Sequence, residues 1–318
     1  MKREIKRLII SSLALLFCAS KAFIYDIRVM RRWDNASRHY CYFIGLGDFH
    51  DKHHKITATH IADIDAIIRK CDPSRTKLIF EDISSPGFLG KCSCRKFFVN
   101  SNGGVLGGLS KKYKNKGFKD IENVEYRFCR VTSLAPVINN INANYRKFLP
   151  TSRITIENFK NEIVDISKDI LSYKDGNILR SWYKKCVAQA ENNMKVLKFN
   201  SMLTMNIADF VYKNSNAQNR LNFVKKLLVF DSPLIDAKIV HSIVNARGKQ
   251  NIIAIAGGSH IKNVSCVLQK IGFRPVYNSK IVIKREYNPR KCLGCNVAPG
   301  GFCSRPQPAD LKILNRFL

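Results

Sequence analysis

The sequence predicts an α/β protein: a central, mostly parallel sheet flanked by helices, with a helical insertion that covers one edge. Two short apolar runs, 42–46 and 252–256, are bounded by glycines and have the length of strands buried on both faces. A segment with isoleucines at helical spacing, 57–70, separates the first run from another apolar run at 77–80. The order strand, helix, strand is typical of a parallel pair.

The N-terminal end has the form of a secretory signal peptide. Four basic residues within 2–7 precede an apolar stretch at 8–17, and small residues follow. We therefore expect an exported protein, periplasmic or secreted, with cleavage after Ser20 or Ala22. Lipidation of Cys18 and a permanent membrane anchor are the alternatives, but the apolar stretch falls short of the ~20 residues that a bilayer requires.

A polar, basic link follows the leader, and the first strand is expected at 41–46. The second strand ends in Glu81, and a third is expected at 121–127. Residues 132–247 then have the pattern of successive helices with weak breaks. This block is interpreted as a cap over the sheet or as a separate subdomain.

The strand and helix pattern returns near the end of the chain. A strand ends at Ala256, a helix is expected at 261–271, and a final strand is expected through 281–283. A Pro/Gly/Cys-rich tail follows.

These patterns predict an organisation in five parts. They are a signal peptide (1–22), a first α/β half (38–130), the helical insertion (131–247), a second α/β half that completes the sheet (248–286), and a Cys/Pro-rich tail (287–318).

The chain is strongly basic, with 54 Lys and Arg against 24 Asp and Glu and a formal net charge of +30. Such a charge can indicate an anionic partner, either nucleic acid or a lipid surface. It also arises when a whole sequence is enriched in Lys together with Asn and Ile, as this one is. No run resembles a nucleic-acid motif, so the compositional explanation is favoured, with an anionic surface as the alternative.

Eleven cysteines suit an exported protein. Cys92 and Cys94, and in the tail Cys292, Cys295 and Cys303, lie in Gly/Ser/Pro-rich segments where disulfides commonly hold irregular chain together. Zinc binding by the tail cysteines is the alternative, but a second C-x-x-C pair is missing. The pattern favours disulfides, and their connectivity stays open.

Two stretches share the pattern G-x-x-H, at 47–50 and 257–260, and each follows an apolar run. Parallel strands present their carboxyl ends at one edge of a sheet, so His50 and His260 are expected there together, beside Glu81. Imidazole binds divalent metals or takes a proton near neutral pH, and a carboxylate completes the metal shell, orients the imidazole or acts as base.

Three segments, 47–54, 78–82 and 254–273, together resemble the TIKI/TraB superfamily. That group also contains the ChaN-like haem-binding proteins and the erythromycin esterases. Its hallmarks are two G-x-x-H motifs, an acidic residue after the second strand, and a helical insertion before the last motif. The resemblance covers roughly 41–130 and 231–284.

The resemblance implies a role for each matching residue. His50 and His260 would be metal ligands or the catalytic base, and Glu81 would be their carboxylate partner. Arg127, at the end of the third strand, would stabilise an oxyanion or hold an anionic substrate group. Asp48 stands where relatives often have Glu, which favours a metal site over a mechanism that relies on that Glu.

Two functions therefore compete. The first is a hydrolase, and specifically a metal-dependent peptidase, that acts on a peptide or small-molecule substrate through water bound to a divalent metal ion. The second is a protein that binds haem, iron or another ligand without catalysis, because Asp51, His53 and His54 resemble the ChaN-like members.

Overall fold

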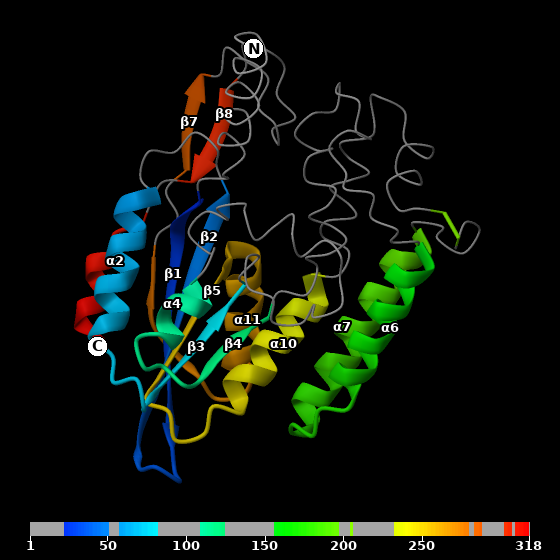
Figure 1. The fold of residues 1–318 in the computed structure, drawn as a ribbon, viewed down its shortest axis with the longest axis horizontal. Coiled ribbons are helices and arrows are strands. Elements are labelled where there is room, and N and C mark those ends of the chain that lie inside the picture. Colours follow the sequence, from blue (N-terminus) through cyan, green and yellow to red (C-terminus); the bar gives the residue numbers. More distant parts are fainter. Residues whose placement is uncertain are drawn as a thin grey trace, which may run out of the picture.

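The chain is described by a computed structural model (Figure 1). The residues that it describes are 22–50, 57–81, 109–124, 156–196, 204–205, 232–279, 283–287, 302–306 and 309–317. The strands are β1 (Ala22–Asp34), β2 (His39–His50), β3 (Thr76–Phe80), β4 (Ile121–Asn123), β5 (Asn251–Gly257), β6 (Arg274–Asn278), β7 (Ile283–Tyr287) and β8 (Phe302–Pro306). The helices are α2 (Thr57–Arg69), α4 (Leu109–Lys114), α6 (Ile156–Leu171), α7 (Asn177–Val196), α10 (Ser232–Val244), α11 (Gly258–Lys270) and the 3₁₀ helix η4 (Leu311–Arg316).

Six strands form one mixed sheet in the order β4-β3-β5-β2-β1-β6. Strands β4, β3, β5 and β2 are parallel neighbours. Strand β1 pairs antiparallel with both β2 and β6, and β7 and β8 form a separate antiparallel pair. The predicted α/β class with a mostly parallel sheet is therefore confirmed, with an antiparallel side that the prediction did not contain.

The predicted polar link before the first strand was wrong, because those residues form β1. Four apolar residues of this strand, Ile24, Ile27, Val29 and Met30, are buried although the same strand contains three arginines and two aspartates. The register shifts between Ile24 and Asp26, so the alternation of apolar and polar residues is interrupted. That interruption and the basic residues obscure the strand pattern in the sequence.

The final strand of the large sheet also differs from the prediction. It is β6, which precedes the expected 281–283 segment, and β7 begins only at Ile283. An exposed edge strand that contains Pro275 carries little apolar signal, which explains the error. Within the predicted helical block, the described residues include the helices α6, α7 and α10.

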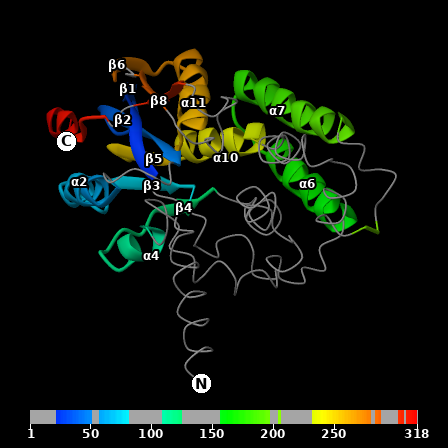
Figure 2. The same ribbon diagram turned by 90° about the horizontal axis from the view of Figure 1, so that it is seen from above.

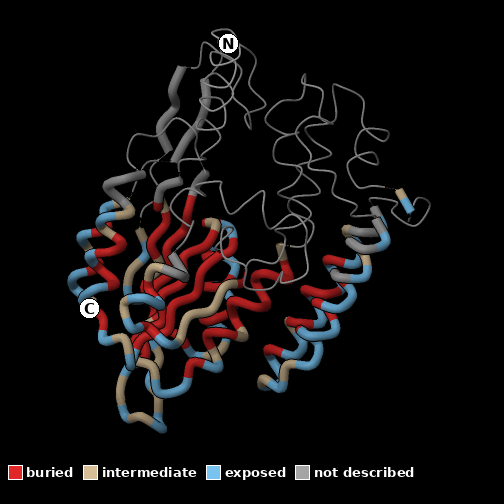
Figure 3. The backbone as a smooth tube through the Cα atoms, in the orientation of Figure 1, coloured by how far each residue is buried: buried red, intermediate tan, exposed pale blue. Residues whose placement is uncertain are grey.

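Helices cover both faces of the sheet (Figure 2). One face packs against α10 and α11, with α6 and α7 beyond α10, and the other packs against α2, α4 and η4. In β2, Phe43 belongs to the first core, whereas Ile44 and Leu46 belong to the second, as the alternation of a strand requires. Buried residues accordingly concentrate in the sheet and on the helix sides that face it (Figure 3).

A glycine in β2 allows α11 to approach the sheet closely. A Cβ atom on Gly45 would lie 2.7 Å from Cγ2 of Ile261, so any larger residue would push the helix away. The close packing of α11 on β2 matters for the site, because α11 carries His260 near its start. Within the part of the chain that the structure describes, no helix combines the length and the apolar composition needed to span a bilayer.

On the other face, a buried carboxylate joins α2 to α4. Asp65 accepts hydrogen bonds from Lys116 Nζ at 2.6 Å, Arg69 Nη2 at 2.6 Å and the Tyr113 hydroxyl at 3.2 Å, and it pairs with Lys112 Nζ at 3.0 Å. Burial alone would raise the pKa of Asp65, but the hydrogen bonds from Lys116, Lys112 and Arg69 outweigh it and hold the pKa well below its usual range.

We predict that Asp65→Asn lowers stability near neutral pH and that the deficit shrinks in acid. The folded-state pKa lies below the unfolded value of about 3.9, so the contribution of Asp65 is complete above that value and is lost as pH falls through the folded pKa. Urea midpoints of wild type and variant at about pH 7, 5 and 3 would test this. Asp63→Asn on the same helix is the control, and an Asp65→Asn deficit that stays constant down to the lowest pH would contradict the prediction.

Candidate functional site

Three parallel strands end at the same edge of the sheet, and they carry two of the sequence-predicted residues, Asp48 and Glu81, to that edge. Asp48 lies near the end of β2, Glu81 follows β3 directly, and Gly257 ends β5. Asp48 is the register partner of Gly257, and the Glu81 N–H donates to the carbonyl of Ile255 at 3.0 Å. The backbone pairing of the sheet therefore fixes the positions of Asp48, Glu81 and Gly257 at this edge.

His260 reaches this edge because α11 begins immediately after β5. Its side chain lies between two carboxylates: Nδ1 is 2.7 Å from Oδ1 of Asp236, and Nε2 is 3.8 Å from Oε1 of Glu81. His260 and Asp236 are each 4% exposed, and Glu81 is 5% exposed. We call this row of side chains, Asp236, His260 and Glu81, the carboxylate–imidazole row.

The hydrogen bonds around Asp236 assign the imidazole proton. Asp236 comes from the middle of α10, and its Oδ2 accepts a hydrogen bond from Asn263 Nδ2 at 2.9 Å. An ionised carboxylate can only accept, so the proton between Asp236 and His260 belongs to Nδ1 of the imidazole. In the neutral imidazole, Nε2 then carries a lone pair on the side of Glu81.

Glu81 is held by the end of the neighbouring strand. Its Oε2 accepts the backbone N–H of Gly257 at 2.7 Å, and Oε1 is the atom nearest the imidazole. A Cβ atom on Gly257 would lie 3.3 Å from Cδ2 of His260 and 3.6 Å from Oε2 of Glu81. A side chain at Gly257 would therefore crowd the imidazole of His260, whereas its contact with Glu81 would be an ordinary one.

Asp48 and Tyr25 lie beside the row. Asp48 is 3% exposed and is the pair partner of Gly257, one strand spacing of about 4.8 Å away. Tyr25 lies at the register shift of β1, between Ile24, which pairs with Asp48, and Asp26, which pairs with Gly47. Partial burial raises its pKa, and the carboxylates of Asp26 and Asp48 raise it further, with Arg28 opposing them. The Tyr25 hydroxyl therefore stays protonated and able to donate at neutral pH.

The turn between β5 and α11 has no space for a side chain at position 258 beside Tyr25. A Cβ atom on Gly258 would overlap the hydroxyl and ring of Tyr25, so this glycine lets the tyrosine lie directly over the start of α11. The two glycines of the second G-x-x-H motif thus leave space for different side chains: Gly257 for the imidazole of His260, and Gly258 for Tyr25.

The remaining predicted residues are less fully placed. His50 is the last residue of β2, two positions after Asp48, and its backbone pairs with Ala22, but its side chain lies outside the described part. Arg127, His53 and His54 lie outside the described residues. So do Cys92, Cys94, Cys292 and Cys295 and the side chain of Cys303, on which the disulfide prediction depends.

Sequence reasoning missed Asp236 and Tyr25. A signal for Asp236 exists: α10 is rich in apolar residues and nearly all of its residues are buried, so a charged residue inside it must have a partner. Tyr25 gave no comparable signal, because its position depends on the register shift in a strand that the sequence pattern concealed.

Imidazole nitrogen and carboxylate oxygen are both metal ligands, and the carboxylate of Asp236 behind the imidazole is a common arrangement around metal-binding histidine. His260 Nε2 and Glu81 Oε1 thus fit two positions of a divalent metal site. Among the described side chains, no group of three or more His, Cys, Asp and Glu residues is placed to hold a metal ion. His50 is the sequence-predicted third ligand.

Comparisons of the chain with protein-family models, with curated proteins and with solved structures found no match. The resemblance to the TIKI/TraB superfamily therefore rests on the sequence motifs alone.

We predict that Gly258→Ala destabilises the protein by about 1–3 kcal/mol, the usual cost of forcing extra atoms into a packed site. The added Cβ would overlap Tyr25, so most of the loss should disappear when Gly258→Ala is combined with Tyr25→Ala. Urea unfolding of the two single variants and the double variant measures this coupling. Ser259→Ala, at an exposed neighbouring position, is the control, and a Gly258→Ala variant as stable as that control would contradict the packing.

Proposed function

We propose that the protein is a hydrolase of the TIKI/TraB type that cleaves a peptide or another acyl bond at the carboxyl edge of its parallel strands, with His260 as the acid–base group. The observation that supports this most is the carboxylate–imidazole row, in which Nδ1 of the ring is hydrogen-bonded to Asp236 and Nε2 faces Glu81. A histidine with one nitrogen fixed by a carboxylate is the usual arrangement of a catalytic base.

The first step of the mechanism is proton transfer to His260. Nε2 takes a proton from the attacking water, and Asp236 stabilises the resulting imidazolium through the 2.7 Å hydrogen bond at Nδ1. The imidazolium then returns that proton to the leaving amine or alcohol as the acyl bond breaks. The carboxylates of Asp48, Glu81 and Asp236, all at most 5% exposed, favour positive charge at this edge. These carboxylates would therefore stabilise the imidazolium that forms during the reaction.

Glu81 is placed to position the water. The 3.8 Å between His260 Nε2 and Glu81 Oε1 is too long for a direct hydrogen bond, but a water molecule beside the pair can reach both atoms at about 2.8 Å. Glu81 Oε1 would accept a hydrogen bond from one O–H of that water, while Nε2 takes the proton of the other O–H. The Tyr25 hydroxyl would donate to the oxyanion that develops on the substrate.

A divalent metal ion is the proposed cofactor in the metal-dependent form of this mechanism. His260 Nε2 and Glu81 Oε1 would hold it with His50, and Nε2 would then act as a metal ligand in place of its role as base. When bound, the metal ion would lower the pKa of a water molecule towards ~7 and polarise the substrate carbonyl. The roles of Asp236 in orienting the imidazole and of Tyr25 as a donor are the same with the metal or without it.

We predict that His260→Asn and Glu81→Gln each reduce hydrolysis by about 100-fold or more, the usual effect of losing a positioned proton-transfer group. The assay follows cleavage of a peptide library by mass spectrometry, with the full chain after chelation and after adding Zn²⁺ or Mn²⁺. Asp236→Asn should lower kcat more than it raises KM, because it acts through His260. His39→Asn, at the tip of the β1–β2 hairpin, is the control and should leave activity unchanged.

Cleavage that survives both His260→Asn and Glu81→Gln would rule out the proposed site. Absence of cleavage in the wild type, combined with a Soret band that appears on haem titration, would instead favour the non-catalytic haem-binding alternative. Thermal melts of every variant separate loss of activity from loss of fold.

A further inference from the structure

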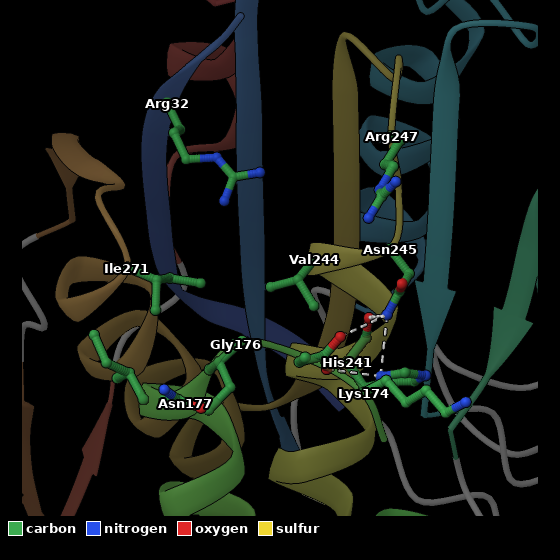
Figure 4. A pocket seen from close by; sticks show the side chains of 12 residues that line it. Arg32, Lys174, Gly176, Asn177, His241, Val244, Asn245, Arg247 and Ile271 are labelled. Carbon is green, nitrogen blue, oxygen red and sulfur yellow. Dashed lines mark hydrogen bonds and ion pairs between the residues drawn. The ribbon is translucent and has the colours of Figure 1, made fainter. Parts of the chain in front are cut away.

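A second site candidate lies at the opposite edge of the sheet, away from the carboxylate–imidazole row. A cavity of about 780 Å³ opens there between β1, the α6–α7 connection, the start of α7 and the end of α10 (Figure 4). Arg32 and Arg247 flank the cavity, and Val244 lies between them in the view of Figure 4. A volume of this size is typical of pockets that hold small organic ligands.

The charged groups of the cavity are mostly positive. Arg32 comes from β1, Lys174 from the loop before α7, and Arg247 from the loop after α10. Among the described residues, no carboxylate lies within ion-pair distance of any of these three side chains. The Arg32 guanidinium lies 4.7 Å from the centre of the Phe273 ring, an interaction that supports its position without using its hydrogen-bond donors.

Asp175 is the carboxylate among the described residues of the cavity wall, and its hydrogen-bonding capacity is already used. Asp175 accepts hydrogen bonds from the Tyr183 hydroxyl at 2.6 Å, from His241 Nδ1 at 2.9 Å and from Asn245 Nδ2 at 3.3 Å. The His241 ring is further fixed by stacking on Tyr173, with 3.5 Å between ring centres and 8° between planes. Asp175 thus organises the wall, and its described hydrogen bonds involve neither Arg32 nor Arg247.

The rest of the lining includes apolar side chains. Val244 and Ile271 contribute partly buried aliphatic surface, and Leu179 adds a buried one. A ligand in the cavity would therefore contact cationic side chains at one end and aliphatic side chains at the other.

We propose that this cavity binds an organic anion, with a phosphate or carboxylate group held by Arg32 and Arg247 and an apolar body against Val244 and Ile271. Guanidinium groups bind both anions through paired hydrogen bonds, which accounts for the choice of ligand class. The cavity uses none of the groups of the carboxylate–imidazole row, so the proposal stands whether or not the protein is a hydrolase.

The test is calorimetric titration of the full chain with phenyl phosphate, benzoate and inorganic phosphate at about 0.15 M salt, where long-range attraction by the basic chain is screened. Phenyl phosphate or benzoate should bind at a single site and more tightly than inorganic phosphate. The double variant Arg32→Gln/Arg247→Gln should weaken that binding by about tenfold or more, because each lost guanidinium removes a charge-assisted pair of hydrogen bonds. The control, Lys114→Gln/Lys119→Gln, removes the same charge from exposed positions and should leave affinity unchanged.

A second measurement does not depend on the variants folding. Phenylglyoxal modifies accessible arginines, and phenyl phosphate should slow modification of Arg32 and Arg247 in the wild type, as mapped by mass spectrometry. Equal weakening by both double variants would show general attraction to a basic chain and overturn the proposal. Failure of all three probes to bind, or modification that phenyl phosphate does not slow, would overturn it as well.

Discussion

The hydrogen bond between Asp236 and His260 is the interaction on which the rest of the candidate site depends. A carboxylate that is 4% exposed is unfavourable without hydrogen-bond donors, and Asp236 receives two, from His260 Nδ1 and Asn263 Nδ2. Both donors come from α11, whereas Asp236 comes from α10. The polar contact therefore joins the two helices that cover one face of the sheet, and it orients the imidazole towards Glu81 at the same time.

The sheet supplies the second constraint, because it determines where α11 starts. Strand β5 passes directly into α11 through Gly257 and Gly258, and neither position has room for a Cβ atom without disturbing the site. The N–H of Gly257 also holds Glu81, so a single turn orders both ends of the carboxylate–imidazole row. The chemistry proposed for His260 thus follows from packing that the fold requires in any case.

Much of this arrangement could be predicted from the sequence. Strands β2, β3 and β5 are apolar runs, and their parallel order follows from the helices between them, so the meeting of Asp48, Glu81 and His260 at one edge was predictable. Asp236 was not predicted, because the partner of a buried charge is decided by how α10 packs on α11. Tyr25 was not predicted either, since it depends on the register shift of β1, whose arginines concealed the strand.

The state of the His260 ring tests the account most directly. Nitrogen-15 NMR of the imidazole distinguishes the two neutral tautomers from the doubly protonated ring, with His260→Asn identifying the signal. The account predicts that Nδ1 carries a proton, which it donates to Asp236, and that the Nε2 signal shifts when Zn²⁺ is added. A neutral ring with its proton on Nε2 instead, or an Nε2 signal indifferent to Zn²⁺, would show that the row is only a structural cluster and contradict the proposed role of His260.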